Sequence, residues 1–226
     1  MNGSVMLIGL MALAGGSGIT RKEPPPECPA GATWQETGDT EVFTLPGEEP
    51  FARVGWCALV DGTRHGPMRA YWRSGWLGRE THWATGVETG PLSQYFGNGR
   101  PWIEAGQRAG KLHGRFVQWH PGGQRARVMH FDDGRPHGLA TLWSERGVRV
   151  SQGAFVDGKK QGAWEAWHDN GVFKELARWE DGRLHGRQLT WSEGGVFALG
   201  ACWEEGERVW ESRAEGEART RACGPY

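Results

Sequence analysis

Histidine and aspartate recur along the sequence at a spacing that could support metal binding or acid–base catalysis. Four histidines lie at multiples of 24 residues from one another, and three of them follow an aspartate by four positions: His65, His113, His137 and His185, with Asp61, Asp133 and Asp181. Repeated histidines are typical zinc ligands, and an Asp–His pair is a common catalytic unit. The choice between these chemistries and a structural role depends on how the chain positions the repeated copies.

The glycines reveal the elements that position these residues. One glycine recurs every 24 residues without a slip, a second follows it by four residues and a third by thirteen. The three columns are Gly62, Gly86, Gly110, Gly134, Gly158, Gly182 and Gly206; Gly66, Gly90, Gly114, Gly138, Gly162 and Gly186; and Gly75, Gly99, Gly123, Gly147, Gly171 and Gly195. We interpret the first two columns as one chain reversal and the third as another, because glycine adopts the positive φ that tight turns need.

Two reversals per repeat leave two strands of about seven residues each, so each repeat predicts one β-hairpin. Glycine at this frequency would break a helix. The sequence therefore predicts an all-β fold, an elongated and twisted antiparallel meander of six 24-residue hairpin repeats.

Aromatic rings recur with the same period and predict the core. One column lies nine residues after the first glycine and a second lies 21 residues after it, with mostly small residues two positions before the second column. The columns are Tyr71, Tyr95, Trp119, Trp143, Trp167 and Trp191; Trp83, Gln107, Phe131, Phe155, Trp179 and Trp203; and Thr81, Ala105, Met129, Gly153, Ala177 and Ala201. Because cross-strand ring pairs stabilise sheets, we expect both ring columns to form one continuous aromatic ladder.

In such a meander, equivalent histidines lie two strands apart, about 9.6 Å, whereas the ligands of one zinc ion lie about 2 Å from it. We therefore predict turn histidines with local hydrogen bonds and no metal site.

The sequence contains no G-x-S-x-G motif and no phosphate-binding GxxxxGK[ST] motif, and the acidic pairs Asp132–Asp133 and Glu204–Glu205 fall beside turns. These patterns predict a protein that is not an enzyme and needs no cofactor.

The phrases "DGRLHG" and "DGKKQGAWEAWHDNG" resemble the MORN-repeat variant of the YwqK-type family of bacterial proteins, antitoxins of toxin–antitoxin systems. The likeness covers residues 57–208, and the MORN repeat has the same glycine offsets. The resemblance implies an elongated β-meander that serves as an interaction surface for proteins or, in some members, for lipid. A toxin partner is implied by the family's name alone.

The four cysteines lie in one pair near each end of the chain. Cys28 with Cys57 and Cys202 with Cys223 would each close a loop of roughly 20 to 30 residues and stabilise it by about 3 kcal/mol. Disulfides require an oxidising compartment, and four free thiols in a cytosolic protein are the alternative. We predict the two disulfides and a role for each in pinning one end of the sheet.

The N-terminus is typical of a signal peptide, with an apolar stretch over Val5–Leu13 and a small-x-small cleavage pattern ending at Ala14. The stretch is too short to span a bilayer comfortably. We predict a periplasmic or secreted protein, with a lipoprotein as the alternative. The predicted organisation is a signal peptide at 1–20, a linker and N-terminal cap at 21–56, the repeat domain at 57–208 and a C-terminal cap at 209–226.

Charge gives no indication of a nucleic-acid partner. The chain has 26 Lys and Arg against 27 Asp and Glu, a net charge of −1, and the two signs are interspersed. A nucleic-acid or anionic-membrane surface usually needs a basic cluster. The charge balance supports neither surface, and we predict no nucleic-acid partner and no transmembrane span.

Five aromatic residues outside the two ring columns are the candidate binding residues: Trp72, Phe96, Trp102, Trp164 and Trp210. Exposed rings could stack on sugars or dock a partner peptide, whereas rings packed against residues 28–56 would only cover the sheet. The sequence predicts a non-catalytic interaction or scaffold module of the cell envelope that binds another protein. A cell-wall or glycan-binding module is the alternative.

Overall fold

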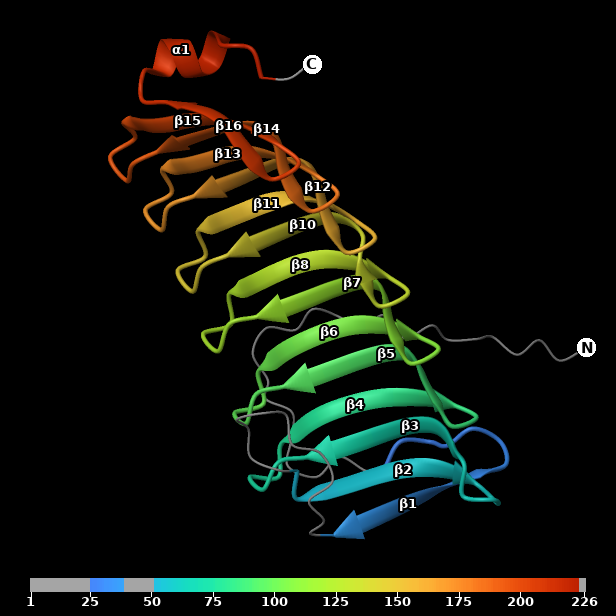
Figure 1. The fold of residues 1–226 in the computed structure, drawn as a ribbon. Helices are drawn as coiled ribbons and strands as arrows, with labels where there is room; N and C mark the ends of the chain where they lie inside the picture. The colour runs from blue at the N-terminus through green and yellow to red at the C-terminus, as the bar shows by residue number, and fades with distance from the viewer. Residues whose placement is uncertain (1–24, 39–50, 224–226) are drawn as a thin grey trace, which may run out of the picture.

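The computed structural model describes residues 25–38 and 51–223, and the signal peptide predicted at 1–20 lies outside them. The described residues form one 16-stranded antiparallel sheet in which successive strands pair in chain order, as Figure 1 shows, except that the short β9 pairs only with β8, which also pairs with β10. The predicted all-β hairpin meander is confirmed. Its elements are β1 (Ala32–Gly38), β2 (Arg53–Leu59), β3 (Arg64–Tyr71), β4 (Leu77–Ala84), β5 (Val87–Tyr95), β6 (Pro101–Arg108), β7 (Lys111–Trp119), β8 (Arg125–Asp132), β9 (Arg135–Pro136), β10 (Gly138–Trp143), β11 (Arg149–Val156), β12 (Lys159–Trp167), β13 (Phe173–Glu180), β14 (Arg183–Trp191), β15 (Phe197–Glu204), β16 (Glu207–Ser212) and the helix α1 (Glu215–Thr220).

From Gly86 on, the first glycine of each repeat closes a two-residue hairpin turn. From Gly86 to Gly206 it follows a residue that also has positive φ, between 45° and 51°, such as Asp133 before Gly134. Two successive positive φ values define the type I′ turn, whose twist matches that of the flanking strands. The glycine N–H also donates to a carbonyl of the preceding hairpin, as from Gly134 to Leu112 at 2.8 Å. The turns on this side of the sheet are therefore tied to one another.

The third glycine of each repeat closes the opposite turn. In the loop from Trp72 to Trp76, the Trp72 N–H donates to the Trp76 carbonyl at 2.9 Å and the Gly75 N–H donates to the Trp72 carbonyl at 2.8 Å. Gly75 has φ of 85°, the left-handed position of a three-residue hairpin loop. The same bonds recur in each later repeat, so every repeat carries the two predicted reversals.

The second glycine of each repeat lies within a strand and not in the turn where the sequence interpretation placed it. Between β4 and β5 the register moves from Thr81 opposite Leu92 to Trp83 opposite Glu88, so that extra residues around Gly90 bulge out of β5. Gly90 has φ of 81°, which β-branched or bulky residues rarely adopt. Bulges bend a strand and increase its twist, and their repetition accounts for the curved sheet in Figure 1.

The two ring columns lie on opposite faces of the sheet, so the expectation of a single ladder is wrong. Trp164 lies opposite Ala177, two residues before Trp179, so Trp179 of the second column shares the face of Trp164. Trp167 of the first column lies three residues from Trp164 along β12, and an odd separation puts it on the other face. We call the face that carries Met129, Trp164 and Trp179 the Met129 face, and the opposite one the Trp167 face. Each face has its own line of rings.

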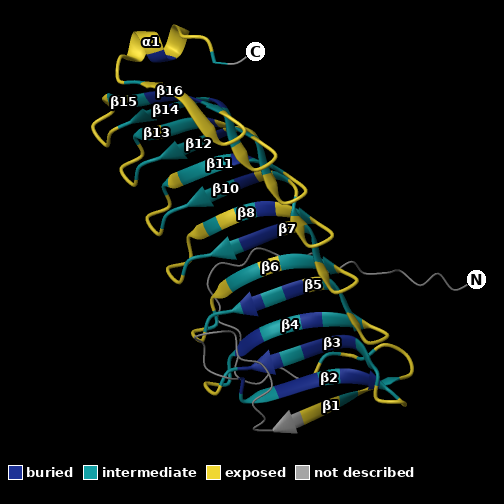
Figure 2. Ribbon diagram, viewed as in Figure 1, coloured by how far each residue is buried: buried dark blue, intermediate teal, exposed yellow. Residues whose placement is uncertain are grey.

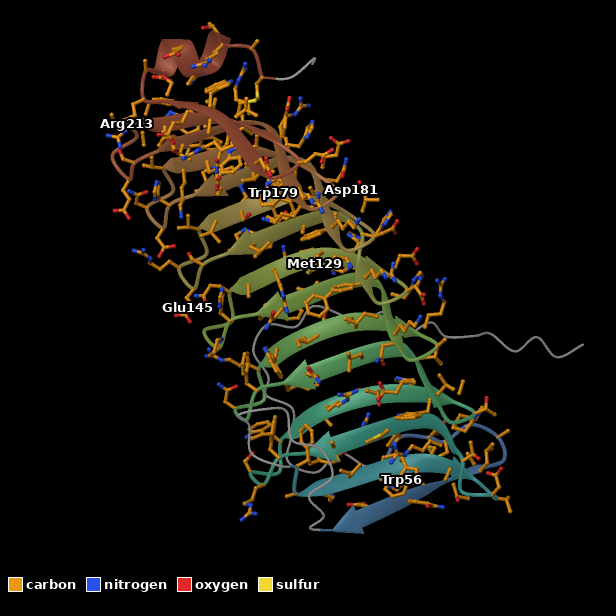
Figure 3. The ribbon with its side chains drawn as sticks, in the orientation of Figure 1. Trp56, Met129, Glu145, Trp179, Asp181 and Arg213 are labelled. Atoms are coloured by element: carbon orange, nitrogen blue, oxygen red, sulfur yellow. A yellow bond between two sulfur atoms is a disulfide. The ribbon has the colours of Figure 1, made fainter. Side chains whose placement is uncertain are left out.

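The Met129 face holds the larger buried cluster, which includes Phe116, Met129, Ala140 and Trp164. Rings of neighbouring strands meet there, with Phe116 and Phe131 centred 5.4 Å apart. The small column leaves room as expected, because the Trp164 ring lies over Gly153 and a Cβ at that glycine would overlap it. Figure 3 shows Met129 and Trp179 between the two rows of turns, which Glu145 and Asp181 mark.

The ends of the sheet are anchored by the two predicted disulfides, which are both present. Cys28–Cys57 joins the segment before β1 to β2, and Cys202–Cys223 joins the chain after α1 to β15. On the Trp167 face, Ala218 of α1 is fully buried against Gly200. Figure 2 shows buried residues concentrated in β2 to β5, whereas the turns along the sheet are exposed.

Gly153→Ala tests the packing of the Met129 face. The added methyl group would overlap the Trp164 ring, so we expect a loss of about 1–3 kcal/mol in the free energy of unfolding, measured by urea denaturation. Gly97→Ala is the matched control, because a Cβ there meets nothing within 4 Å and the change should be within about 0.5 kcal/mol. Equal stability of the two variants would contradict this packing.

The second disulfide should hold α1 on the sheet. In the double variant Cys202→Ala, Cys223→Ala we expect a loss of about 3 kcal/mol, because the cross-link limits the freedom of the unfolded chain. Amide hydrogen exchange should rise in Glu215–Thr220 and stay unchanged in β5 to β7, since each hairpin mainly contacts its neighbours. An unchanged exchange rate in α1 would show that packing alone anchors it.

Candidate binding surfaces

The five aromatic residues proposed as a binding set do not form one surface. Trp164 is only 6% exposed and belongs to the core of the Met129 face, where its indole N–H donates to the Ala154 carbonyl at 3.0 Å. Trp72 and Trp210 are half-buried, and their indole N–H groups donate to the carbonyls of Tyr95 and Ala222. These three residues have structural partners within the chain.

Phe96 and Trp102 remain as a half-buried pair beside one turn, with ring centres 5.8 Å apart. Trp72 lies in the preceding repeat and packs against Phe51, with ring centres 4.5 Å apart. Residue 51 belongs to the segment expected to cover these rings, so the packing alternative holds for Trp72. The Phe96 and Trp102 rings pack against each other and make no ring contact with the described part of residues 28–56.

The Trp167 face carries a line of rings that the sequence interpretation missed. Ring centres are 5.6 Å apart for Trp167 and Phe173, 5.1 Å for Phe173 and Trp191, and 6.0 Å for Trp191 and Phe197. The Arg149 guanidinium lies 3.9 Å from the Trp167 ring centre. The missed signal is the column that lies 15 residues after the first glycine of each repeat, whose last two members are Phe173 and Phe197. Across the strands, these rings alternate with those of the Tyr/Trp column.

Cations of the chain itself cover several ring faces. The Lys160 ammonium lies 4.3 Å from the ring centres of both Trp164 and Trp179, and burial lowers its pKa. The Arg64 guanidinium lies 4.9 Å from the Trp83 ring centre. Cation–π contacts of this kind stabilise a protein by about 0.5–1 kcal/mol at exposed sites. A sugar could not stack on a ring face that a cation already occupies.

The turn histidines contact neighbouring hairpins, and His185 also lies 3.4 Å from a carboxylate oxygen of Glu180 in its own hairpin. His65 Nδ1 accepts from the Thr85 N–H at 3.3 Å, and His185 Nδ1 accepts from the Glu205 N–H at 3.4 Å. His137 lies 3.6 Å from a carboxylate oxygen of Asp157 in the next turn. These contacts are structural ones, and most of them cross the repeat boundary.

A groove crosses the Trp167 face at its C-terminal end. One part, of about 450 Å³, lies between the sheet and the chain that follows α1, and is lined by Ala163, Leu176, Arg178, Gly186, Arg187, Leu189, Thr220, Ala222 and Cys223. A smaller hollow shares Arg178 and Gly186 with it and leads to a third of about 680 Å³, lined by Lys159, Glu180, Asp181, Arg183, His185 and Glu205. We call these three hollows together the C-terminal groove.

The C-terminal groove has a different chemistry at each end. Ala163, Leu176 and Leu189 give one end an apolar floor, and Arg178 and Arg187 border it. The Arg187 Nη2 donates to the Arg221 carbonyl at 2.9 Å, while its buried Nε has no partner among the described residues. The other end carries the acidic side chains of the β13–β14 turn, which Asp181 marks in Figure 3. The groove therefore offers cationic side chains at one end and acidic side chains at the other, so it could bind groups of either charge.

Within residues 25–38 and 51–223, no helix is long and apolar enough to cross a membrane, and no three metal-ligating side chains gather into a site. No family model matches the sequence, and no curated protein matches it. The likeness to MORN repeats therefore rests on the glycine and tryptophan columns themselves.

Ion pairs link successive turns along the row that contains the first glycine of each repeat. Lys111 Nζ lies 2.8 Å from a carboxylate oxygen of Asp133, and Lys159 Nζ lies 3.6 Å from one of Asp181. The hydrogen bond from Lys111 lowers the pKa of the exposed Asp133 below its ordinary 3.8. Because the folded-state pKa is depressed, this contact stabilises the fold above the ordinary pKa and is lost as pH falls through the folded value.

Lys111→Ala tests this contact. We expect the pKa of Asp133, measured by NMR titration of its carboxyl carbon, to rise toward 3.8 because the charged donor is removed. Lys159→Ala is the matched control, since that lysine contacts Asp181 and should leave Asp133 unchanged. A pKa that stays depressed in Lys111→Ala would mean that the contact is not the cause.

Proposed function

We propose that the protein is a non-catalytic repeat scaffold that binds a partner protein in the cell envelope through the C-terminal groove. The groove is the observation that carries the proposal, because it crosses successive strands as an extended segment would. A segment lying there would place apolar side chains over Leu176 and Leu189 and an acidic group beside Arg178 and Arg187. This distribution, an apolar floor with charged borders, is common at protein interfaces.

The cysteines and the N-terminus support the proposed compartment. Cys28–Cys57 and Cys202–Cys223 account for every cysteine of the chain, and such bonds persist in oxidising compartments. Together with the signal-peptide pattern, they support a periplasmic or secreted location. The resemblance to MORN-variant repeats supports an interaction surface, and export favours an envelope protein over a cytoplasmic toxin as its partner.

The Phe96–Trp102 pair favours a second candidate, binding of a cell-wall or other glycan. Both rings are half-buried and lie at the surface beside a turn, where aromatic side chains can stack on sugars. This site lies outside the C-terminal groove, so the two functions respond to different substitutions.

Ala163→Trp tests the partner-protein proposal. Ala163 is exposed in the groove, so a large ring there should block the groove without disturbing the core. In affinity purification from the native cell envelope, we expect one protein to co-purify in equimolar amount with the wild type and to be reduced at least tenfold with Ala163→Trp. Leu139→Trp is the matched control, because Leu139 occupies the same repeat position, is 54% exposed and lies outside the groove.

The same purified proteins distinguish the glycan candidate. Retention on a glycan array that is lost in Trp102→Ala and kept in Ala163→Trp would replace the partner-protein proposal with sugar binding. Equal recovery of the co-purifying protein with Ala163→Trp and Leu139→Trp would show that the partner does not bind in the C-terminal groove.

A further inference from the structure

The sheet ends at two edge strands, β1 and β16, and the two edges differ in protection. An unpaired edge exposes backbone N–H and C=O groups and can pair with another strand, so proteins usually guard edges with bulges, charges or a covering element. On β16 these guards are present. Its pairing with β15 contains a register shift, Arg208 forms an ion pair with Glu211, and α1 packs beside it.

The β1 edge has none of these guards among the described residues. β1 pairs with β2 through seven residues without a register shift, from Ala32 opposite Leu59 to Gly38 opposite Arg53. Its sequence, ATWQETG, contains no lysine and no proline. Its one charge, Glu36, is paired with Arg53 of β2 at 3.0 Å, so it presents no free charge to an incoming strand.

β1 is also held in a fixed extended form. The Cys28–Cys57 bond anchors the chain just before it, and the half-buried Trp34 ring lies over Gly55 of β2. Thr33 and Gln35 are exposed on the other side of the strand. A rigid edge loses little conformational freedom when another strand pairs with it, which favours association.

The sequence of β1 is complementary to itself in antiparallel pairing. A two-fold axis through Gln35 is the one arrangement in which all seven residues pair, because Gln35 is the central residue of Ala32–Gly38. Gln35 then lies opposite Gln35 of a second copy, and Trp34 lies opposite Glu36. The two Glu36 carboxylates are thereby kept apart, whereas an axis through Glu36 would set like charges directly opposite each other.

We propose that the protein forms a two-fold symmetric dimer by antiparallel pairing of β1 with β1 of a second copy. Closed two-fold pairing is the commonest way for one surface patch to associate with itself, and here it pairs an edge that no other described strand covers. The joined sheet carries each face continuously from one copy to the other, with a C-terminal groove at each distant end. The proposal is independent of the groove's ligand, because β1 and the groove lie at opposite ends of the sheet (Figure 1).

Charge substitution at the axis tests the dimer. In Gln35→Glu and in Gln35→Lys a like charge faces itself, so we expect each variant to dimerise about fivefold more weakly than the wild type in analytical ultracentrifugation of the full chain. An equimolar mixture of the two variants should recover the wild-type dimer, because the opposite charges then pair. Thr33→Glu is the matched control, since it lies on the same exposed side of β1 but does not face itself, and it should dimerise as the wild type does.

A cross-linking experiment fixes the register. Gln35→Cys should form an intermolecular disulfide under mild oxidation, because residues directly opposite in antiparallel strands have Cβ atoms about 5 Å apart. Thr33→Cys should not, because its partner residue is four positions away. A monomeric wild type, a dimer insensitive to charge at position 35, or equal cross-linking of both cysteine variants would each overturn the proposal. Circular dichroism of every variant separates these outcomes from a failure to fold.

Discussion

Backbone positions with positive φ set the register between neighbouring strands, and the rest of the structure depends on that register. Each repeat has left-handed glycines at both turns and a third within a strand. The turn glycines fix where each strand begins and ends, and from Gly86 on the N–H of the first glycine in each repeat donates to the neighbouring hairpin. The glycine in the strand, such as Gly90, allows the bulge that bends each hairpin in the same direction.

A single curved sheet has no second layer to cover it, so each face must bury its own apolar groups. On the Met129 face, rings lie over small residues and Lys160 lies between Trp164 and Trp179. On the Trp167 face, Trp and Phe rings alternate across strands from Trp167 to Phe197. Because these contacts join adjacent strands, stability in the sheet is mostly local.

The two ends interrupt this repetition, and the distinctive surfaces of the molecule lie there. At the C-terminal end, the Cys202–Cys223 bond draws the chain back over β15, and the space left between chain and sheet is the groove. At the N-terminal end, the Cys28–Cys57 bond anchors the extended strand β1, whose outer edge pairs with no other strand of the described residues. Repetition provides a long rigid spacer between a groove and an edge, an arrangement suited to a scaffold.

The sequence by itself determined the hairpin repeat, the strand order and the two disulfides. A strict 24-residue spacing of turn residues acts locally, and local signals can be interpreted without knowledge of distant contacts. Only the tertiary structure decided the faces, because the register between neighbouring strands determines which side chains share a side of the sheet. That is why Trp164 proved to be core, and why the Phe173–Phe197 line was missed. The groove could not be predicted either, since it lies between strands and a C-terminal segment brought together by folding.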